Sequence, residues 1–143
     1  DLLIKTVVAT CDQEIVDYIE SIGGQVVMTS GKHERASDRC AEALGYLEKK
    51  DDIQYDIVVM VQGDEPMTHP DMVSEAVMPM VNNTGIIVTN LLGDIESEEE
   101  SIDMMRVLEH GKKVKMVSTS YHTYPVDTEA DLKRVEERMY EKW

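Results

Sequence analysis

Two aspartates that lie far apart in the sequence could together hold a metal ion. Asp64 stands in the segment 62–66, Gln-Gly-Asp-Glu-Pro, directly after the unbroken apolar run 57–61. Asp127 stands just before the last predicted helix. Ligands of open α/β sheets bind at the carboxyl ends of strands, and Mg²⁺ prefers hard oxygen ligands. If the two preceding strands run parallel and close together, both carboxylates face one cleft and can hold Mg²⁺ against a phosphate.

Each aspartate also has a purely structural interpretation. Gly63 and Pro66 favour a sharp turn, so the acidic residues around Asp64 could simply face solvent. Asp127 precedes Thr128, and the residues 128–131 form a capping box for the last helix. A carboxylate there could serve only to favour the positive end of the helix dipole. From local sequence alone both alternatives stay open.

Basic side chains are densest in the loop that leads into the second predicted helix. The loop 30–37 contains Lys32 and His33, and Ser37 is a good cap for the helix, which carries Arg39. Because a helix N-terminus favours anions, this is the best local candidate for a nucleotide or phosphate contact. The alternative is a solvated basic loop. The other histidines have no metal-ligand spacing and are interpreted as surface or structural residues: His69, His110 and His122.

Strands and helices alternate along most of the chain, which positions these loops. Apolar periodicity predicts strands at 2–10, 25–29, 56–62, 85–90 and 114–119. It also predicts helices capped by Asp12, Ser37 and Thr128, a helix with Pro70 in its first turn, and a short helix at 101–109. The run 57–61 reads as a strand that is buried on both faces. The order predicts a three-layer α/β fold with a mainly parallel sheet, interrupted by an acidic linker at 93–100. The polar segments 30–37, 62–66 and 121–128 then lie at strand ends.

Charge and composition narrow the classes of partner. The chain has 143 residues and a net charge of −15, which argues against nucleic acid and anionic membranes. A phosphate-bearing substrate would need a local concentration of cations or a metal ion. Cys11 and Cys40 are too few for a disulfide framework or a zinc site. No run approaches the length of a membrane span, and no signal-peptide pattern is present, so we expect a cytoplasmic protein.

Four stretches in the same order resemble the 3-deoxy-manno-octulosonate cytidylyltransferases, the CMP-KDO synthetases. The likeness spans nearly the whole chain, and the most distinctive of the four is the Val-Gln-Gly-Asp-Glu-Pro motif. The four stretches are 7–12 with the helix that ends at Gly23-Gly24, 27–39, 59–66 and 126–135. The resemblance implies a Rossmann-like nucleotidyltransferase fold in a single domain over residues 1–143.

The resemblance also implies an activity and roles for individual residues. The sugar's anomeric hydroxyl would attack the α-phosphate of CTP, giving CMP-sugar and pyrophosphate for lipopolysaccharide synthesis. Asp64 and Asp127 would be catalytic and would hold Mg²⁺, and Gln62 would contact the sugar. Ser37 and Arg39 would contact the cytidine end, with Lys32 and His33 in the same loop. The partners are therefore CTP and a KDO-like acidic sugar, and the family suggests a homodimer.

The chain departs from the family pattern in three places. The family begins with a strand and a basic, Gly-containing loop that cradles the triphosphate, and this chain starts after that position. A long family segment is replaced here by the linker near 93–101. The family often has a Glu-Gln pair where this chain has Asp103 and Met104. Three hypotheses therefore stay open: a KDO cytidylyltransferase, a synthetase for another sugar, and a truncated, non-catalytic module that binds nucleotide or metal.

Overall fold

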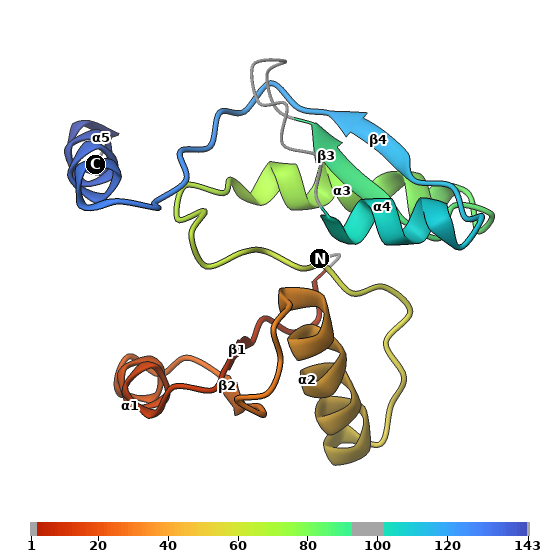
Figure 1. Ribbon diagram of the computed structural model, residues 1–143, viewed down its shortest axis with the longest axis horizontal. Helices are drawn as coiled ribbons and strands as arrows, with labels where there is room; N and C mark the ends of the chain where they lie inside the picture. The colour runs from red at the N-terminus through yellow and green to blue at the C-terminus, as the bar shows by residue number, and fades with distance from the viewer. Residues whose placement is uncertain (1–2, 93–101, 143) are drawn as a thin grey trace. The chain divides into compact units, whose positions relative to one another are not determined.

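A computed structural model describes residues 3–92 and 102–142, and it divides the chain into two units, Asp1–Met60 and Val61–Trp143 (Figure 1). Each unit is an α/β assembly with one pair of parallel strands. The prediction that a family segment is missing near 93–101 lies outside the described residues. The α/β class with parallel strands is confirmed, although the described strands form two separate pairs.

The first unit is a βαβ arrangement followed by a long helix. Strand β1 (Val8–Thr10) pairs in parallel with β2 (Val26–Met28), and helix α1 (Gln13–Ser21) connects them. The predicted cap is confirmed, because an Asp12 carboxylate oxygen accepts a hydrogen bond from the Glu14 amide at 2.8 Å. Gly23 has a φ of +77°, a conformation that favours glycine and ends the helix. Helix α2 (Ala36–Asp51) follows β2.

The described residues of the second unit form three helices and the other strand pair. Helix α3 (Pro70–Asn82) begins with Pro70 at its first position, as predicted, and packs on strand β3 (Thr89–Leu92). The Thr89 hydroxyl donates to the Ala76 carbonyl at 2.8 Å, which joins the two elements. Helix α4 (Ile102–Glu109) leads to strand β4 (Lys115–Ser118), which pairs in parallel with β3. Helix α5 (Glu129–Lys142) closes the described chain.

Two predictions about local structure are wrong. Residues 56–62 form no strand, and Val58 and Val61 are about half exposed, at 50% and 52%. A strand that is buried on both faces needs hydrogen-bonded neighbours, and no described strand pairs with this segment. The second helix begins at Ala36 after Arg35, so Ser37 lies inside its first turn and is not its cap.

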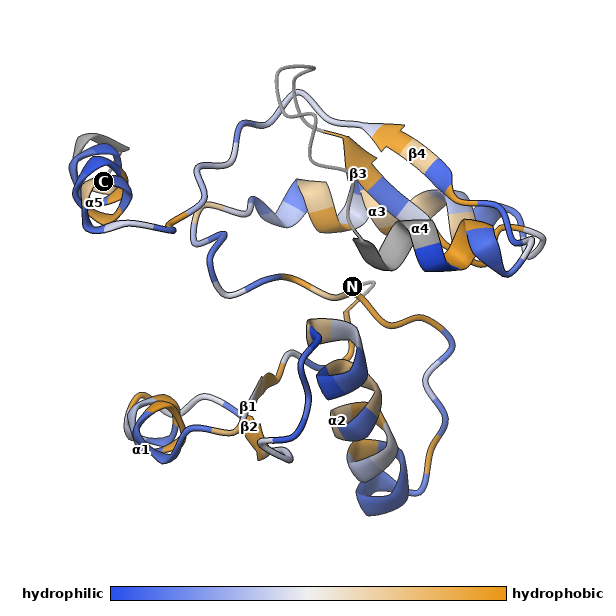
Figure 2. Ribbon diagram, in the orientation of Figure 1, coloured by the Kyte–Doolittle hydropathy of each residue, from blue (hydrophilic) through white to orange (hydrophobic). Residues whose placement is uncertain are grey.

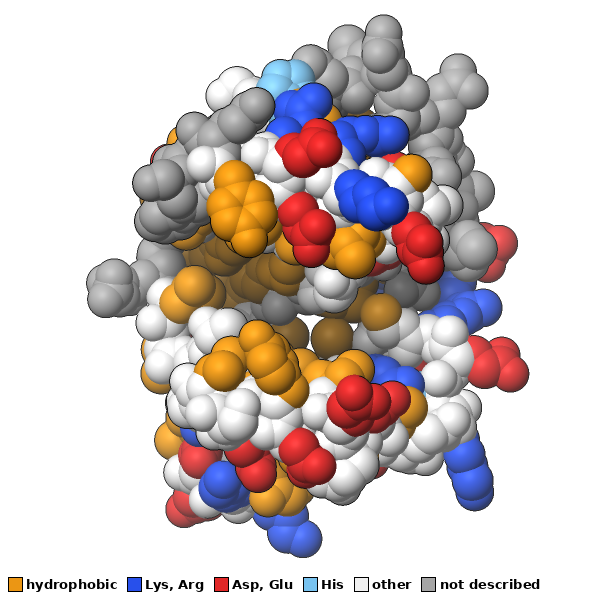
Figure 3. All heavy atoms as spheres, turned by 90° about the vertical axis from the view of Figure 1, so that its left-hand side faces the viewer, with side chains coloured by type: hydrophobic (Ala, Val, Ile, Leu, Met, Phe, Trp, Pro, Cys, Tyr) orange, Lys and Arg blue, Asp and Glu red, His pale blue; other side chains and the backbone are white. Residues whose placement is uncertain are grey.

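Apolar side chains are distributed between small cores and exposed helix faces. Figure 2 shows hydrophobic residues along β1 and β2 and on parts of β3 and β4, and Val27, Met72, Val77 and Val135 are buried. Helix α1 exposes Ile15 and Tyr18, and its C-cap residue Ile22 is exposed as well. Figure 3 shows such hydrophobic side chains between charged ones on one side of the molecule. No helix among the described residues is long and apolar enough to cross a membrane.

Candidate active site

The two aspartates that the sequence singles out are brought together in the second unit. The Val126 amide donates a hydrogen bond to the Asp64 carbonyl at 2.8 Å. Asp127 therefore follows directly after a residue that is hydrogen-bonded to Asp64. Residues 62–68 fold as consecutive turns, because the Glu65 amide donates to the Gln62 carbonyl and the Thr68 amide to the Glu65 carbonyl. The backbone thus joins two acidic segments that are more than sixty residues apart in sequence.

The side chain of Asp64 lacks a polar partner on its buried side. Its Oδ1 atom is buried and has no hydrogen-bond partner among the described residues, and the same holds for Oε2 of the neighbouring Glu65. Buried polar atoms in proteins are nearly always paired, because desolvation without compensation is costly. A bound cation would satisfy a carboxylate oxygen of this kind.

The acidic side chains at this position fit Mg²⁺ better than a metal ion that is bound by three or more protein side chains. In the described part of the chain, no group of three or more His, Cys, Asp or Glu side chains converges on one point. Mg²⁺ is usually held by one or two carboxylates, together with water and substrate phosphates. Asp64, half-buried, and Asp127, exposed, can supply the two carboxylates.

Asp131, and not Asp127, completes the capping box with Thr128 at the start of α5. The Thr128 amide and hydroxyl donate to Asp131 Oδ2 at 3.1 and 2.7 Å, and the Asp131 amide donates to the Thr128 hydroxyl at 3.3 Å. The predicted capping box is therefore confirmed. The hydrogen bond from the Thr128 hydroxyl is the main cause of the lowered pKa of the Asp131 carboxyl. Because Asp131 serves the cap, the exposed Asp127 carboxylate does not have that task.

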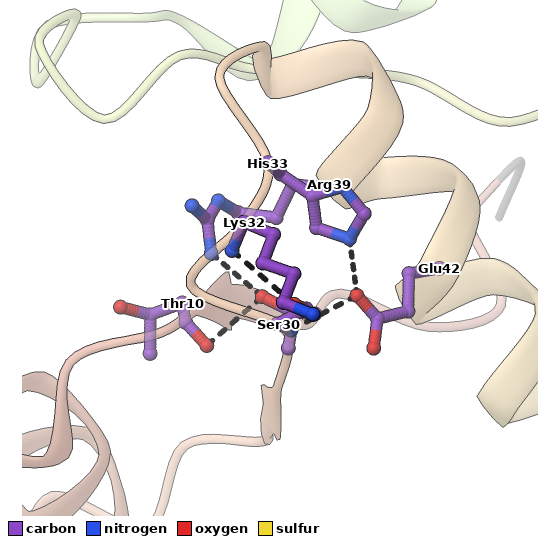
Figure 4. Close-up of polar contacts among 7 residues, drawn as sticks. Thr10, Ser30, Lys32, His33, Arg39 and Glu42 are labelled. Carbon is purple, nitrogen blue, oxygen red and sulfur yellow. Dashed lines mark hydrogen bonds and ion pairs between the residues drawn. The ribbon is translucent and has the colours of Figure 1, made fainter.

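The basic loop in the first unit is held by a separate set of hydrogen bonds (Figure 4). Arg39 donates from its guanidinium to the Thr29 hydroxyl at 2.7 Å, and this hydroxyl donates to the Thr10 carbonyl at 3.1 Å. Thr10 and Thr29 are both buried and stand at the ends of β1 and β2. Arg39 is thereby fixed to the carboxyl ends of the parallel strands, where ligands of α/β sheets bind.

Glu42 organises the same loop, and the sequence analysis did not select it. Its Oε2 atom accepts hydrogen bonds from the Ser30 amide at 2.9 Å and from His33 Nε2. These two hydrogen bonds, that from Ser30 first, hold the pKa of Glu42 below its ordinary value of 4.5. Glu42 lies three residues after Arg39, so both project from one face of α2, and this spacing was the available signal.

The remaining predicted site residues are placed without a shared contact. Lys32 is exposed, and its amide donates to the Ser30 hydroxyl at 3.2 Å. Ser37 is half-buried in the first turn of α2. Gln62 is exposed, next to the turn that carries Asp64. The structure therefore joins Asp64 with the Asp127 segment in one unit, and Arg39 with the His33 loop in the other.

Glu42 gives the first testable prediction. Because its pKa is lower in the folded state, its hydrogen bonds stabilise the fold fully above pH 4.5, and this contribution is lost as pH falls through the folded-state pKa. We expect the Glu42→Gln variant to be less stable than the wild type at pH 7, with the difference shrinking on acidification. Urea unfolding at pH 7 and pH 3 measures it, with Glu34→Gln in the same loop as control. A difference that is constant with pH would contradict it.

Comparison with known proteins identifies the family. The sequence model of the cytidylyltransferase family matches residues 2–141. The chain belongs to the cytidylyltransferase family. A 3-deoxy-manno-octulosonate cytidylyltransferase of Syntrophus aciditrophicus is 35% identical over 117 residues, which cover 82% of this chain and 43% of that protein. Another from Trichlorobacter lovleyi is 26% identical over 214 residues, covering 96% of this chain and 82% of the relative.

A solved structure supports the same fold. CMP-2-keto-3-deoxy-manno-octonic acid synthetase complexed with CTP matches this cytidylyltransferase chain with a TM-score of 0.83, at 19% identity, over 99% of this chain and 83% of the other. The family resemblance and the nucleotidyltransferase fold are thus confirmed. The chain spans less than half of the Syntrophus relative, and its match to the Trichlorobacter relative stretches over more residues than the chain contains.

Proposed function

We propose that the protein transfers CMP from CTP to a KDO-like acidic sugar in a Mg²⁺-dependent reaction that releases pyrophosphate, as a step in lipopolysaccharide synthesis. The observation that carries the proposal is the hydrogen bond from the Val126 amide to the Asp64 carbonyl. It brings together the two motifs that hold the acidic residues, next to a buried Asp64 oxygen that has no hydrogen-bond partner in the described part of the chain. Family membership and relatives named for this reaction support the choice of substrates.

The bonds that change in the reaction are simple to state. The anomeric hydroxyl oxygen of the sugar forms a bond to the α-phosphorus of CTP, and the bond from that phosphorus to the pyrophosphate oxygen breaks. The hydroxyl proton is released. Mg²⁺, when bound, supplies positive charge that offsets the negative charge of the phosphates and of the transition state. With a net charge of −15, the chain needs such a local cation to accept a triphosphate.

The residues of the chain then have separate tasks. Asp64 and Asp127 would hold the metal ion, and Gln62, beside Asp64, would contact the sugar. In the first unit, Arg39 is fixed by Thr29, and it would contact the cytidine end together with Ser37. Lys32 and His33 would complete this contact, in a loop that Glu42 holds in place.

The experiment is a pyrophosphate-release assay with CTP, Mg²⁺ and KDO, with the product identified by mass spectrometry. We expect CMP-KDO and one pyrophosphate for each sugar consumed, and no release without sugar or Mg²⁺. Parallel reactions with a nonulosonic acid test the rival sugar. The alternative, a non-catalytic module, predicts CTP binding without pyrophosphate release.

A further inference from the structure

Two aromatic rings stack between the segments that carry the two aspartates. The rings of His69 and Tyr121 lie 4.3 Å apart between centroids and are nearly parallel, with an interplanar angle of 9°. His69 follows Asp64 by five residues, and Tyr121 precedes Asp127 by six. Both rings belong to the second unit. They therefore connect the same two chain segments that the bond from Val126 to Asp64 connects.

Asp71 completes this contact and fixes it to α3. The Tyr121 hydroxyl donates a hydrogen bond to Asp71 Oδ2, and the Asp71 amide donates to His69 Nδ1 at 3.2 Å. His69 is the N-cap residue of α3, and its Nδ1 lies 3.6 Å from Asp71 Oδ2. The bond to Asp71 raises the pKa of the Tyr121 hydroxyl, so the hydroxyl stays protonated and able to donate. We call the contact among His69, Asp71 and Tyr121 the clasp.

The segment that holds Asp127 has little regular structure of its own. Between the end of β4 and the start of α5, residues 119–128 form no strand or helix. The Thr119 amide donates to the Leu92 carbonyl at 3.1 Å, and the next backbone bond to a distant element is that from Val126 to Asp64. The clasp lies between these two points and holds residues 121–127 by side chains, in addition to the Arg138 guanidinium, which lies 3.9 Å from the centroid of the Tyr124 ring.

We propose that the clasp is a positioning element that sets the separation of the Asp64 and Asp127 carboxylates. His69, Asp71 and Tyr121 act through the backbone of the two segments and do not touch the metal ion or the substrates. The inference rests on the proposed function, because it concerns the metal site assigned there. With the clasp, the two chain segments are tied at two points, and the aspartate pair is therefore a preorganised site.

Two variants separate positioning from helix capping. His69→Asn removes the stacked ring but keeps a side chain that is a good N-cap, so α3 keeps its cap. Tyr121→Leu removes both the ring and the hydroxyl that binds Asp71. Ser74→Ala, in the next turn of α3, is the matched control, because its hydroxyl bonds only within the helix. Urea unfolding of every variant checks that the fold is kept.

The readouts are Mn²⁺ affinity, measured by electron paramagnetic resonance without nucleotide, and hydrogen exchange of the Val126 amide. Loss of partners that orient metal ligands typically weakens metal binding by about 10- to 100-fold. We expect His69→Asn and Tyr121→Leu to weaken Mn²⁺ binding by about 10-fold and to speed Val126 exchange, while Ser74→Ala changes neither. If the wild type binds Mn²⁺, unchanged Mn²⁺ affinity in both clasp variants would overturn the inference, even if Val126 exchange became faster.

The same data distinguish failure of the clasp from failure of the proposed function. If the wild type binds no Mn²⁺, the proposed metal site is wrong, and Val126 exchange alone then decides the clasp. Faster exchange in both clasp variants supports the tether, and unchanged exchange overturns it. If the wild type binds Mn²⁺ and Asp64→Asn abolishes binding, the metal site stands, and the clasp is judged by its own variants.

Discussion

Replacing Asp64 by asparagine is expected to reduce pyrophosphate release from CTP by more than about 100-fold. Mutation of residues that only hydrogen-bond to a metal ligand already costs about 10- to 100-fold in activity, and Asp64 is proposed to bind the metal itself. Asparagine keeps the size of the side chain but removes the negative charge that would hold Mg²⁺. The measurement is the steady-state rate of pyrophosphate release with saturating CTP, sugar and Mg²⁺.

The stability of the same variant serves as an internal check. Asp64 has a buried carboxylate oxygen without a hydrogen-bond partner among the described residues, and removing an uncompensated charge is not expected to destabilise the fold. We therefore expect an unfolding free energy for Asp64→Asn that is equal to or above that of the wild type. The exposed Asp56, before the same apolar run, provides the control variant Asp56→Asn. Full activity of Asp64→Asn would rule out its assigned role.

Replacing Asp127 by asparagine is expected to raise the Mg²⁺ concentration needed for half-maximal activity by about 10-fold or more, as for other changes at metal ligands. The alternative is a charge that only favours the helix dipole, which is worth about 0.3–1 kcal/mol of stability and would leave the Mg²⁺ requirement unchanged. Titration of the reaction rate with Mg²⁺ distinguishes the two interpretations.

Asp131→Asn is the matched control for this experiment. Asp131 accepts the hydrogen bonds of the Thr128 amide and hydroxyl, so its replacement weakens the start of α5. We expect a lower unfolding free energy and no change in the Mg²⁺ requirement. If Asp131→Asn altered the Mg²⁺ requirement as strongly as Asp127→Asn, Asp127 would have no role distinct from the cap.

Local rules predicted the parts of the fold that local interactions determine. The cap at Asp12, the proline at the start of α3 and the capping box at Thr128 depend on residues a few positions apart. Each of these features could therefore be predicted from residue spacing alone. The parallel pairing within each strand pair also followed from the alternation of strands and helices.

The apolar run at residues 57–61 shows where such rules stop. Its composition is that of a buried strand, but a strand also needs neighbours that supply hydrogen bonds on both sides. No described strand pairs with it, and Val58 and Val61 remain about half exposed. An apolar pattern indicates that a segment favours burial. It does not indicate whether other strands pair with that segment.

The residues of the candidate site likewise include some that local sequence indicated and some that it did not. Asp64 and Asp127 were selected because their motifs carry a signal in the local sequence. Glu42 and the clasp were missed, because the side-chain contacts that define them join residues 9 to 52 positions apart. His69 was interpreted as a surface or structural histidine, and the structure shows it as the cap of α3 stacked on Tyr121.

The central claim, that Asp64 and Asp127 form one Mg²⁺ site, is tested most directly by a double-mutant cycle of Mn²⁺ affinity. The four proteins are the wild type, Asp64→Asn, Asp127→Asn and the double variant. Two ligands of one ion are coupled, so we expect the double variant to bind Mn²⁺ hardly more weakly than the weaker single variant. Losses that add independently, or single variants that bind Mn²⁺ as the wild type does, would contradict a shared site.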